Sequence, residues 1–211
     1  MAQKSSGAES TPRDPLSRDR VLRAALDLVD RDGADALTMR SLAKDLGVEA
    51  PSLYKHVPNK AAILDGICEL IYAEVVVDDV GEAWQDRLRA YADGFRRALL
   101  DHHAAIPILT TRAVSTDGSM LLVEIALAEF ARVGFDPETA RKLLNVVVAM
   151  ITGMVLSEMS DGDTARRSFD APEKFPLASA TVISTPADRD AEFDMAIEML
   201  TEGIERRIPA T

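Results

Sequence analysis

The chain has 211 residues, and apolar residues make up 47% of it, so it can bury a core and is not disordered as a whole. Its single cysteine excludes a disulfide framework and a cysteine-based zinc site, and three histidines leave few ligands for a metal enzyme. The net charge of −11 argues against nucleic-acid binding by the chain as a whole, because phosphate repels acidic groups.

The charge is unevenly distributed. Residues 1–60 carry ten basic and nine acidic side chains, whereas the remainder carries 14 basic and 26 acidic ones. If one end of the chain contacts a polyanion, it is therefore the N-terminal end.

No segment has the pattern of a targeting or membrane-spanning sequence. Residues 1–15 are polar and lack an apolar core, so they are interpreted as a disordered tail and not as a signal peptide. The longest apolar stretch, Leu143 to Leu156, has 14 residues and suits a buried helix better than a bilayer span. We expect a soluble protein in the cytoplasm.

Apolar residues recur at helical spacing along nearly the whole chain. In the first third, the pattern predicts helices over residues 17–31, 38–46, 50–56 and 59–75. Their expected N-caps are Ser17, Thr38 and Asn59, and Gly33 and Gly47 are expected to end the first two. Pro58 is expected to end the third.

The remaining helices are expected over residues 82–101, 116–133, 137–159 and 188–207. Pro107 is expected in a short connecting piece, and residues 161–187 in a loop. Ala180–Ser184 is the only weak strand candidate. The sequence therefore predicts an all-α fold of nine or ten helices, with a disordered tail (1–15), a three-helix domain (16–60) and a larger helical domain (61–207).

Residues 38–60, TMRSLAKDLGVEAPSLYKHVPNK, have the pattern of a helix-turn-helix. Two short helices are joined by a glycine-containing turn, and Ala43 is small where the helices approach closely. The second helix would enter the major groove and present Ser52, Tyr54, Lys55 and His56. Tyr54 and Lys60 suit phosphate oxygens, and Arg40 suits a guanine edge. His56 could instead be a packing residue at the helix end.

The segment LTMRSLAKDLGVEAPSLYKHVPNKAAIL resembles the N-terminal domain of the TetR family of transcriptional repressors, and most closely the tetracycline-repressor type. Weaker similarity follows in WQDRLR, FRRALL, GFDPE and TGMVL. The resemblance implies DNA contacts by Thr38, Arg40, Pro51, Ser52, Tyr54, His56 and Lys60. Ala50 and Lys55 replace the glutamine and tryptophan of the tetracycline type, so the operator should differ.

The resemblance also implies that residues 61–207 form a ligand-binding and dimerisation domain. The helices at 137–159 and 188–207 would pack against their copies in a homodimer. The sequence supports this on its own account, since Leu143–Leu156 is apolar on most of its circumference, so that one side must be buried in this chain and another side could face a partner.

The groups specific for tetracycline are missing. Tyr91, Val76 and Ser157 stand where that type has an asparagine, a histidine and a glutamate, and Ile108 and Leu109 lie where its magnesium-binding histidine would be. We therefore expect no magnesium–tetracycline inducer, no metal and no cofactor. The ligand-binding residues are predicted to be Tyr91, Phe95, Thr111, Arg112, Leu144 and Met154. Arg112 could equally be a structural salt-bridge residue.

Other conspicuous residues have ordinary structural interpretations. His102 and His103 favour an interaction with a helix C-terminus over a metal site. Trp84 is interpreted as a core anchor, and Cys68 as a small buried apolar residue instead of a redox sensor. Met150 and Met154, four residues apart, suit core packing, and a pliable pocket wall is the alternative because thioethers adapt in shape.

The favoured function is a DNA-binding repressor that releases its operator when a small, largely apolar molecule binds the C-terminal domain. An activator, or a regulator that responds to a protein, remains the alternative. An all-helical enzyme is a remote alternative, because the sequence has no HExxH, phosphate-loop or Gly-x-Ser-x-Gly pattern. The protein is therefore not expected to be an enzyme.

Overall fold

A computed structural model describes residues 15–75, 81, 83–160, 173–174, 176 and 186–209. Over these residues the chain forms helices and no strand, which confirms the all-α expectation. The helices are α1 (Arg18–Asp32), η1 (Ala34–Ala36), α2 (Met39–Leu46), α3 (Ala50–Leu53), α4 (Lys60–Ala73), α5 (Trp84–Asp101), η2 (His103–Ala105), α6 (Ile106–Thr111), α7 (Asp117–Arg132), α8 (Pro137–Ser160) and α10 (Pro186–Glu205). Four expectations lie outside the described residues: the tail up to residue 14, most of the 161–187 loop, the Ala180–Ser184 strand candidate and Val76.

The predicted helix ends are confirmed at the N-terminal end of the chain. The side chains of Ser17 and Asn59 accept backbone N–H groups in the first turns of α1 and α4. Thr38 and Ser41 form a reciprocal capping box at α2. Gly47 ends α2 at φ 66°, a left-handed conformation that glycine adopts without a Cβ clash.

Two elements differ from the prediction. The third helix ends at Leu53 and continues as a turn, in which the N–H groups of His56 and Val57 both donate to the Leu53 carbonyl. Pro58 disfavours a helical conformation at Val57 and so ends this turn, but it does not by itself place the helix end at Leu53. Residues 106–111, expected to be a connecting piece, form α6, with Pro107 in the first turn, where the missing N–H of proline costs nothing.

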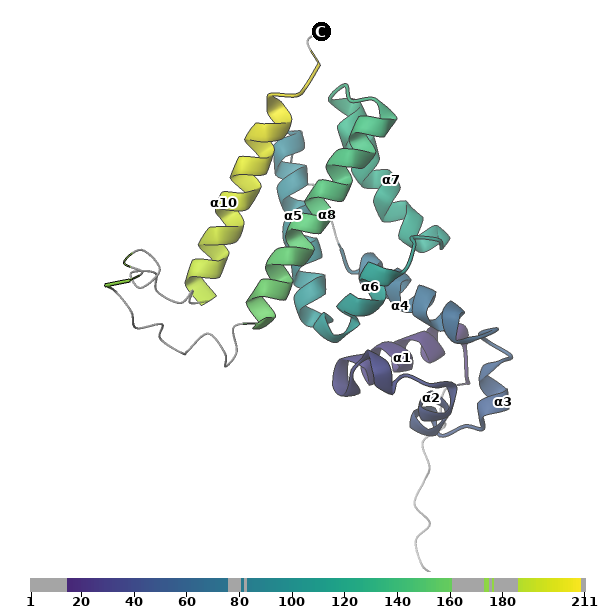
Figure 1. Cartoon of the computed structure of the whole chain (residues 1–211). Coiled ribbons are helices and arrows are strands. Elements are labelled where there is room, and N and C mark those ends of the chain that lie inside the picture. The colour runs from purple at the N-terminus through teal and green to yellow at the C-terminus, as the bar shows by residue number, and fades with distance from the viewer. Residues whose placement is uncertain are drawn as a thin grey trace, which may run out of the picture.

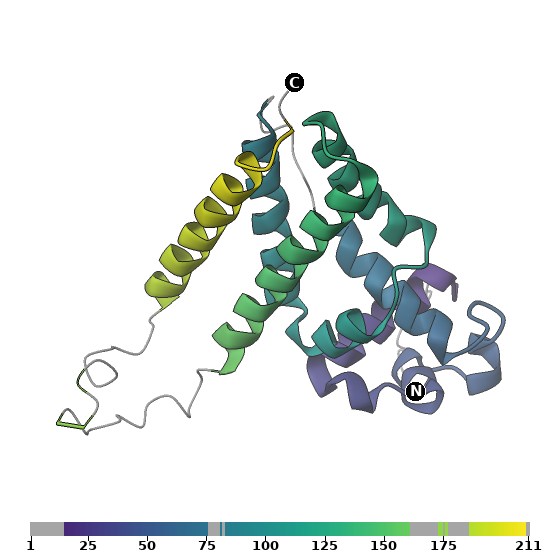
Figure 2. The ribbon, with the colours of Figure 1, turned by 45° about the horizontal axis from the view of Figure 1, so that its top comes forward.

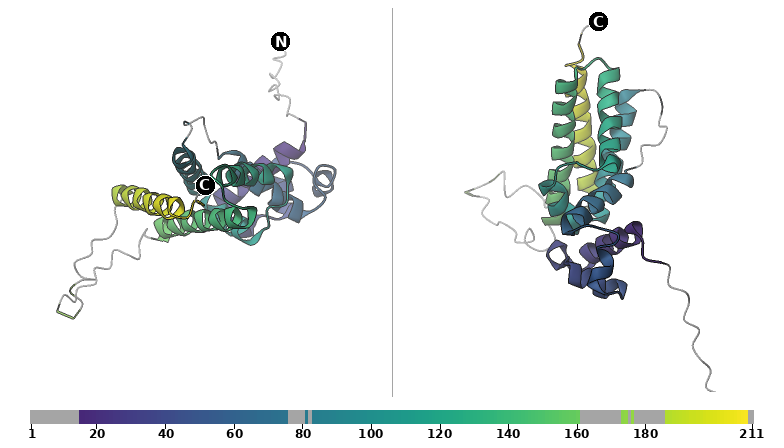
Figure 3. Two further views of the ribbon diagram at one scale, coloured as in Figure 1. Left: turned by 90° about the horizontal axis from the view of Figure 1, so that it is seen from above. Right: turned by 90° about the vertical axis from the view of Figure 1, so that its right-hand side faces the viewer.

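The long helices of the C-terminal part run side by side, and the small unit of α1, α2 and α3 lies at one end of them (Figure 1; Figure 3, right). Helix α4 joins the two parts, because it packs on α1 and also on α5, α6 and α7. The contact between α1 and α4 is tight. A Cβ atom added at Gly66 of α4 would lie 2.4 Å from Leu22 Cδ2 of α1.

Helix α10 packs against both α5 and α8, along the edge of the body seen in Figure 2. The contact centres on Arg96 of α5, which forms ion pairs with Glu158 and Asp190 and places its guanidinium 4.7 Å from the ring centre of Phe193. This cluster fixes α10 on the body.

Helix α8 is longer than the apolar stretch in it. Its residues Pro137–Met159 are long and apolar enough to cross a membrane by length and composition alone. The core helix of a soluble protein meets the same criterion. The sequence analysis considered only the 14-residue apolar stretch from Leu143 to Leu156, which is too short to span a bilayer. That expectation does not hold for the whole helix.

Candidate DNA-binding surface and ligand cavities

The helix-turn-helix is built on a small shared core. Leu42, Ala43 and Leu46 of α2 and Leu53 of α3 are buried. Burial of this apolar face leaves the opposite face of each helix in solvent. The local sequence pattern therefore determines which side chains can reach a DNA groove.

The residues predicted to contact DNA share one property, which is that they lie at the surface. Tyr54 is 53% exposed. The others that are exposed are Thr38, Arg40, Pro51, Lys55 and Lys60, and Ser52 and His56 are half-buried. We call these eight residues the recognition surface. Its members come from the start of α2, from α3 and its following turn, and from the start of α4.

The cations of this region have no acidic partner. Arg40, Lys55 and Lys60 form no ion pair within the described residues, whereas Arg31 on α1 pairs with Asp32 and Asp45. A cation without an intramolecular partner is available to a phosphate or a base edge. The structure adds Lys44 as a further exposed, unpaired cation of this part of the chain. Lys44 lies four residues after Arg40 on α2, and residues four apart share one face of a helix. This spacing could have identified Lys44 from the sequence.

Thr38 has a second role. Its hydroxyl oxygen accepts the Ser41 N–H at 3.0 Å. The side chain therefore shapes the start of α2, and any phosphate contact has to share this hydroxyl with the cap.

His102 lies where the N-terminal unit meets the body. Its Nδ1 is 2.7 Å from Asp30 Oδ2 on α1, and its Nε2 is 2.9 Å from Glu74 Oε2 after α4. Partial burial lowers the pKa of His102, but the two carboxylates outweigh this effect and raise it overall. The main partners of His102 are thus side chains, which corrects the helix-terminus interpretation for this residue. His103 agrees with that interpretation, because its Nδ1 lies 3.3 Å from the Leu100 carbonyl in the last turn of α5. No group of His, Cys, Asp and Glu in the described residues is arranged to hold a metal ion.

Two cavities among the described residues of the body bear on ligand binding. The larger lies between α4, α5, α6 and α8 and has a volume of about 500 Å³. Its wall is mainly apolar and includes Leu99, Ile106, Leu109, Val114, Val148 and Leu156. The rings of Tyr72 and Phe95 add an aromatic portion, with centres 6.2 Å apart. Its polar groups come from Thr110, Arg112, Asn145 and Thr152. The volume and the few polar groups are typical of small-molecule sites.

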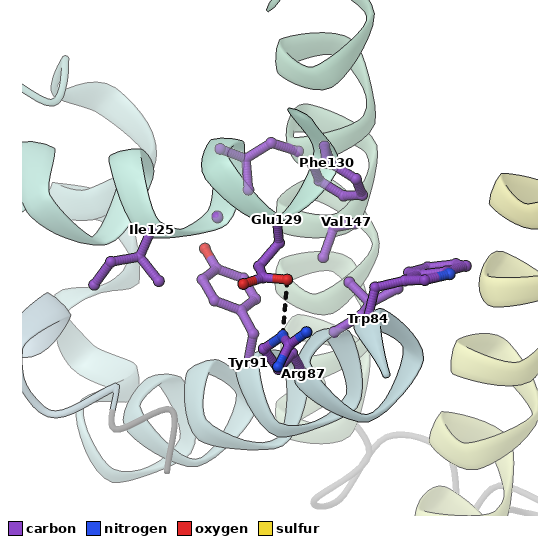
Figure 4. A pocket seen from close by; sticks show the side chains of 10 residues that line it. Trp84, Arg87, Tyr91, Ile125, Glu129, Phe130 and Val147 are labelled. Atoms are coloured by element: carbon purple, nitrogen blue, oxygen red, sulfur yellow. Dashed lines mark hydrogen bonds and ion pairs between the residues drawn. The ribbon is translucent and has the colours of Figure 1, made fainter. Parts of the chain in front are cut away.

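The smaller cavity lies between α5, α7 and α8 and has a volume of about 50 Å³ (Figure 4). Trp84, Tyr91 and Phe130 line it, and an ion pair from Arg87 Nε to Glu129 Oε2 at 2.7 Å crosses it from α5 to α7. Burial raises the pKa of Tyr91. This space is too small for a drug-sized ligand without movement of its walls.

The structure does not bring the six predicted ligand-binding residues into one cavity. Phe95 and Arg112 line the larger cavity, and Tyr91 and Leu144 line the smaller one. The remaining two, Thr111 and Met154, line neither. The Thr111 hydroxyl donates to the Pro107 carbonyl, and Met154 packs half-buried on the core. Tyr72, Asn145 and Thr152 were missed, because only the folded chain brings α4 and α8 to the same cavity.

Arg112 forms the structural ion pair that was one of its two predicted roles, and its role in ligand binding stays a prediction. It lines the larger cavity, and its Nε donates to Asp65 Oδ1 of α4 at 2.6 Å. Trp84 is likewise a buried anchor that also lines a cavity. Cys68 is buried, and burial raises the pKa of its thiol to about 11. A raised pKa suits the predicted small apolar residue and not a reactive thiolate.

A surface of unpaired cations on a helix-turn-helix, joined by one helix to a body with an apolar cavity, defines a ligand-regulated DNA-binding protein. Family models agree with both parts. Residues 21–67 match the bacterial regulatory proteins of the tetR family, and residues 78–208 match the tetracyclin repressor-like C-terminal domain. The chain therefore belongs to the TetR family, whose members are transcriptional regulators and not enzymes, and it has the form of a ligand-regulated repressor.

Known proteins show the same relationship over nearly the full length. A tetracycline repressor protein of class D from Escherichia coli is 34% identical, with 92% of each chain covered. An HTH-type transcriptional regulator from Saccharopolyspora erythraea is 30% identical over 93% of this chain and 87% of its own. The structure is similar to that of the Streptomyces coelicolor TetR family protein ActR in complex with (S)-DNPA, with 26% identity, a TM-score of 0.77 and coverage of 92% of this chain and all of that one.

Proposed function

We propose that this protein is a dimeric repressor in the cytoplasm that binds an operator through residues 16–60. It releases the operator when a largely apolar molecule enters residues 61–207, and it has no enzymatic activity. The observation that carries the proposal is the pairing of an unpartnered cationic recognition surface, which includes the start of α4, with a cavity of about 500 Å³ that Tyr72 near the end of α4 helps to line.

Helix α4 is the route between the two sites. It begins at Lys60, directly after the helix-turn-helix, and its residues Ile67 and Ile71 are fully buried between the parts. A ligand that prefers a form with displaced α4 also displaces the recognition surface. Two such surfaces in a dimer must match major grooves about 34–36 Å apart. A tenfold preference per site is worth about 1.4 kcal/mol, and two sites give about a hundredfold loss of operator affinity.

The proposed dimer uses α8 and α10. Large apolar side chains are exposed on both helices, namely Val146, Leu156 and Met159 on α8 and Met195 and Met199 on α10. Exposed apolar side chains on two packed helices favour an interface. A second copy of the chain is the partner that two operator half-sites require.

The proposed inducer differs from magnesium–tetracycline. The larger cavity presents Ile106, Leu109 and Phe95 to a ligand, and no described group of acidic, histidine or cysteine side chains is arranged to hold a metal ion. Although relatives are named for tetracycline, the chemistry of this wall favours an apolar body with few polar atoms.

The DNA-binding part is tested by selecting genomic duplexes that the purified protein retains, followed by gel shifts. Enrichment of one pseudo-palindromic sequence supports the proposal, and equal retention of all duplexes contradicts it. A transcriptional reporter then distinguishes a repressor, which lowers the signal, from an activator, which raises it.

The cavity is tested with N-phenyl-1-naphthylamine, an uncharged dye that fluoresces in apolar surroundings. Gly153 lines the larger cavity, and a Cβ atom at this position would meet nothing within 4 Å. Gly153→Leu should therefore narrow the cavity and weaken dye binding, whereas Gly153→Ala should retain it. Equal binding by both variants would exclude this cavity as the site.

A further inference from the structure

The guanidinium of Arg112 is only partly used by the protein. Its Nε donates to Asp65 Oδ1 at 2.6 Å, and both side chains are about one-quarter exposed. An arginine has five N–H donors in a planar fork. The other four of Arg112 have no acceptor among the described residues. The terminal nitrogens are therefore free to bind an acidic group.

The position of these free donors points to a ligand. Arg112 lines the larger cavity, and within the described residues its terminal N–H groups do not donate to Asn145 or Thr152, the polar residues that α8 contributes to the same wall. Asn145 of α8 lies exposed at the edge of the same wall, and its amide makes no hydrogen bond within the described part of the chain, so it is available to a ligand. A cation and an unused amide in an apolar cavity fix the orientation of a molecule that has an acidic oxygen at one end.

The partner of Arg112 connects this site to the DNA-binding unit. Asp65 lies on α4, four residues before Glu69, and Glu69 pairs with Arg18 of α1 at 2.9 Å. Residues four apart lie on one face of a helix. One face of α4 is thus held at Asp65 by the cavity wall and at Glu69 by the first helix of the DNA-binding unit.

We propose that Arg112 selects inducers that carry an acidic group on an apolar body, and that this acid competes with Asp65 for the guanidinium. The inference rests on the proposed function, because it assigns the ligand class and the first contact of the same cavity. A bidentate pair between an anion and the terminal nitrogens draws the guanidinium into the cavity. The link from α6 to α4 weakens, and α4 carries the recognition surface away from its DNA-binding position.

Two dyes with the same ring skeleton test the selection of an acid. 8-Anilinonaphthalene-1-sulfonate carries one sulfonate, and N-phenyl-1-naphthylamine lacks it. Arg112→Gln should weaken binding of the sulfonate dye about tenfold and leave the neutral dye unchanged, and Arg112→Lys should restore part of the loss. Only the sulfonate dye should lower the operator affinity of the parent. Equal effects of Arg112→Gln on both dyes would overturn the assignment.

The competition with Asp65 is tested without any ligand. Asp65→Asn removes the charge that holds Arg112 and keeps the size of the side chain, so it should lower operator affinity about threefold to tenfold and strengthen binding of the sulfonate dye. Circular dichroism and sedimentation establish that the variant is folded and dimeric. Unchanged operator affinity together with unchanged sulfonate binding refutes the competition.

The two proposals fail separately. If Gly153→Leu binds the neutral dye as well as Gly153→Ala does, the cavity is not the ligand site and the proposed function is wrong in that respect. If Gly153→Leu binds the neutral dye more weakly than Gly153→Ala does, but Arg112→Gln changes the affinity for both dyes equally, the cavity remains the ligand site. Only the selection of an acid is then refuted.

Discussion

Substitution of Met199 by glutamate should convert the protein to monomers. Met199 is 68% exposed on α10, and Met195, one helical turn earlier, is 60% exposed. Both side chains therefore expose large apolar surfaces to water. They lie on a helix that packs against α5 and α8. In the proposed dimer they are covered by a second copy.

The magnitude follows from burial and symmetry. Covering a methionine side chain is worth about 1.5–3 kcal/mol, of which the exposed two-thirds gives about 1–2 kcal/mol per copy. A twofold interface contains the residue twice, so loss of the contact costs about 2–4 kcal/mol. Burial of two glutamates adds a desolvation penalty of at least a few kcal/mol. The dimer should therefore weaken more than about a thousandfold.

Analytical ultracentrifugation at micromolar concentration measures this directly. Met120→Glu is the matched control, since Met120 is 45% exposed on α7, a helix that the proposed interface does not use, and this variant should remain a dimer. A charge at Val147 would be a poor test, because that side chain is fully buried in its own chain. A dimeric Met199→Glu beside a monomeric Met120→Glu would refute the assignment of the interface.

Three further outcomes follow from the structure. Gly66→Ala should lose about 1–3 kcal/mol in urea unfolding, because its Cβ would lie within 2.6 Å of two methyl carbons of buried Leu22; a stability equal to the parent contradicts the α1–α4 packing. Gly153→Ala, with open space around it, should instead gain up to about 1 kcal/mol in the same assay. The pKa of His102 is raised, so its protonated form stabilises the fold. The stability of the parent should therefore fall as the pH rises from about 6.5 through that raised pKa. The variant His102→Gln should not show this fall in stability. An identical pH profile of both proteins would show that the contacts with Asp30 and Glu74 contribute nothing.

The recognition surface was largely predictable because its determinants are local. Caps such as Thr38 and Asn59, the left-handed Gly47 and the apolar positions around Leu42 fall within a short stretch of sequence, and each has one geometric consequence. The early end of α3 shows the limit of such reasoning. The helix ends about three residues before the predicted His56, and the signal used for its end, Pro58, acts directly only on Val57.

The cavities were less predictable because they depend on which helices meet. Tyr91 and Phe95 are one turn apart on α5 and their rings lie 6.1 Å apart, as an aromatic pair in one pocket would. Yet Tyr91 faces α7 in the smaller cavity, while Phe95 faces α4 and α6 in the larger one. His102 shows the same limit, since its partner Asp30 is 72 positions away in the chain.

The most direct test of the central claim is the salt dependence of operator binding, measured by fluorescence anisotropy on the selected duplex. Lys60→Ala should weaken all duplexes alike and lower the salt slope by about 1 for each subunit. Arg40→Ala should lose about 1–3 kcal/mol per half-site and relax the preference at one base pair. If both variants bind the selected duplex like the parent at matched salt, residues 38–60 do not form the DNA-binding surface.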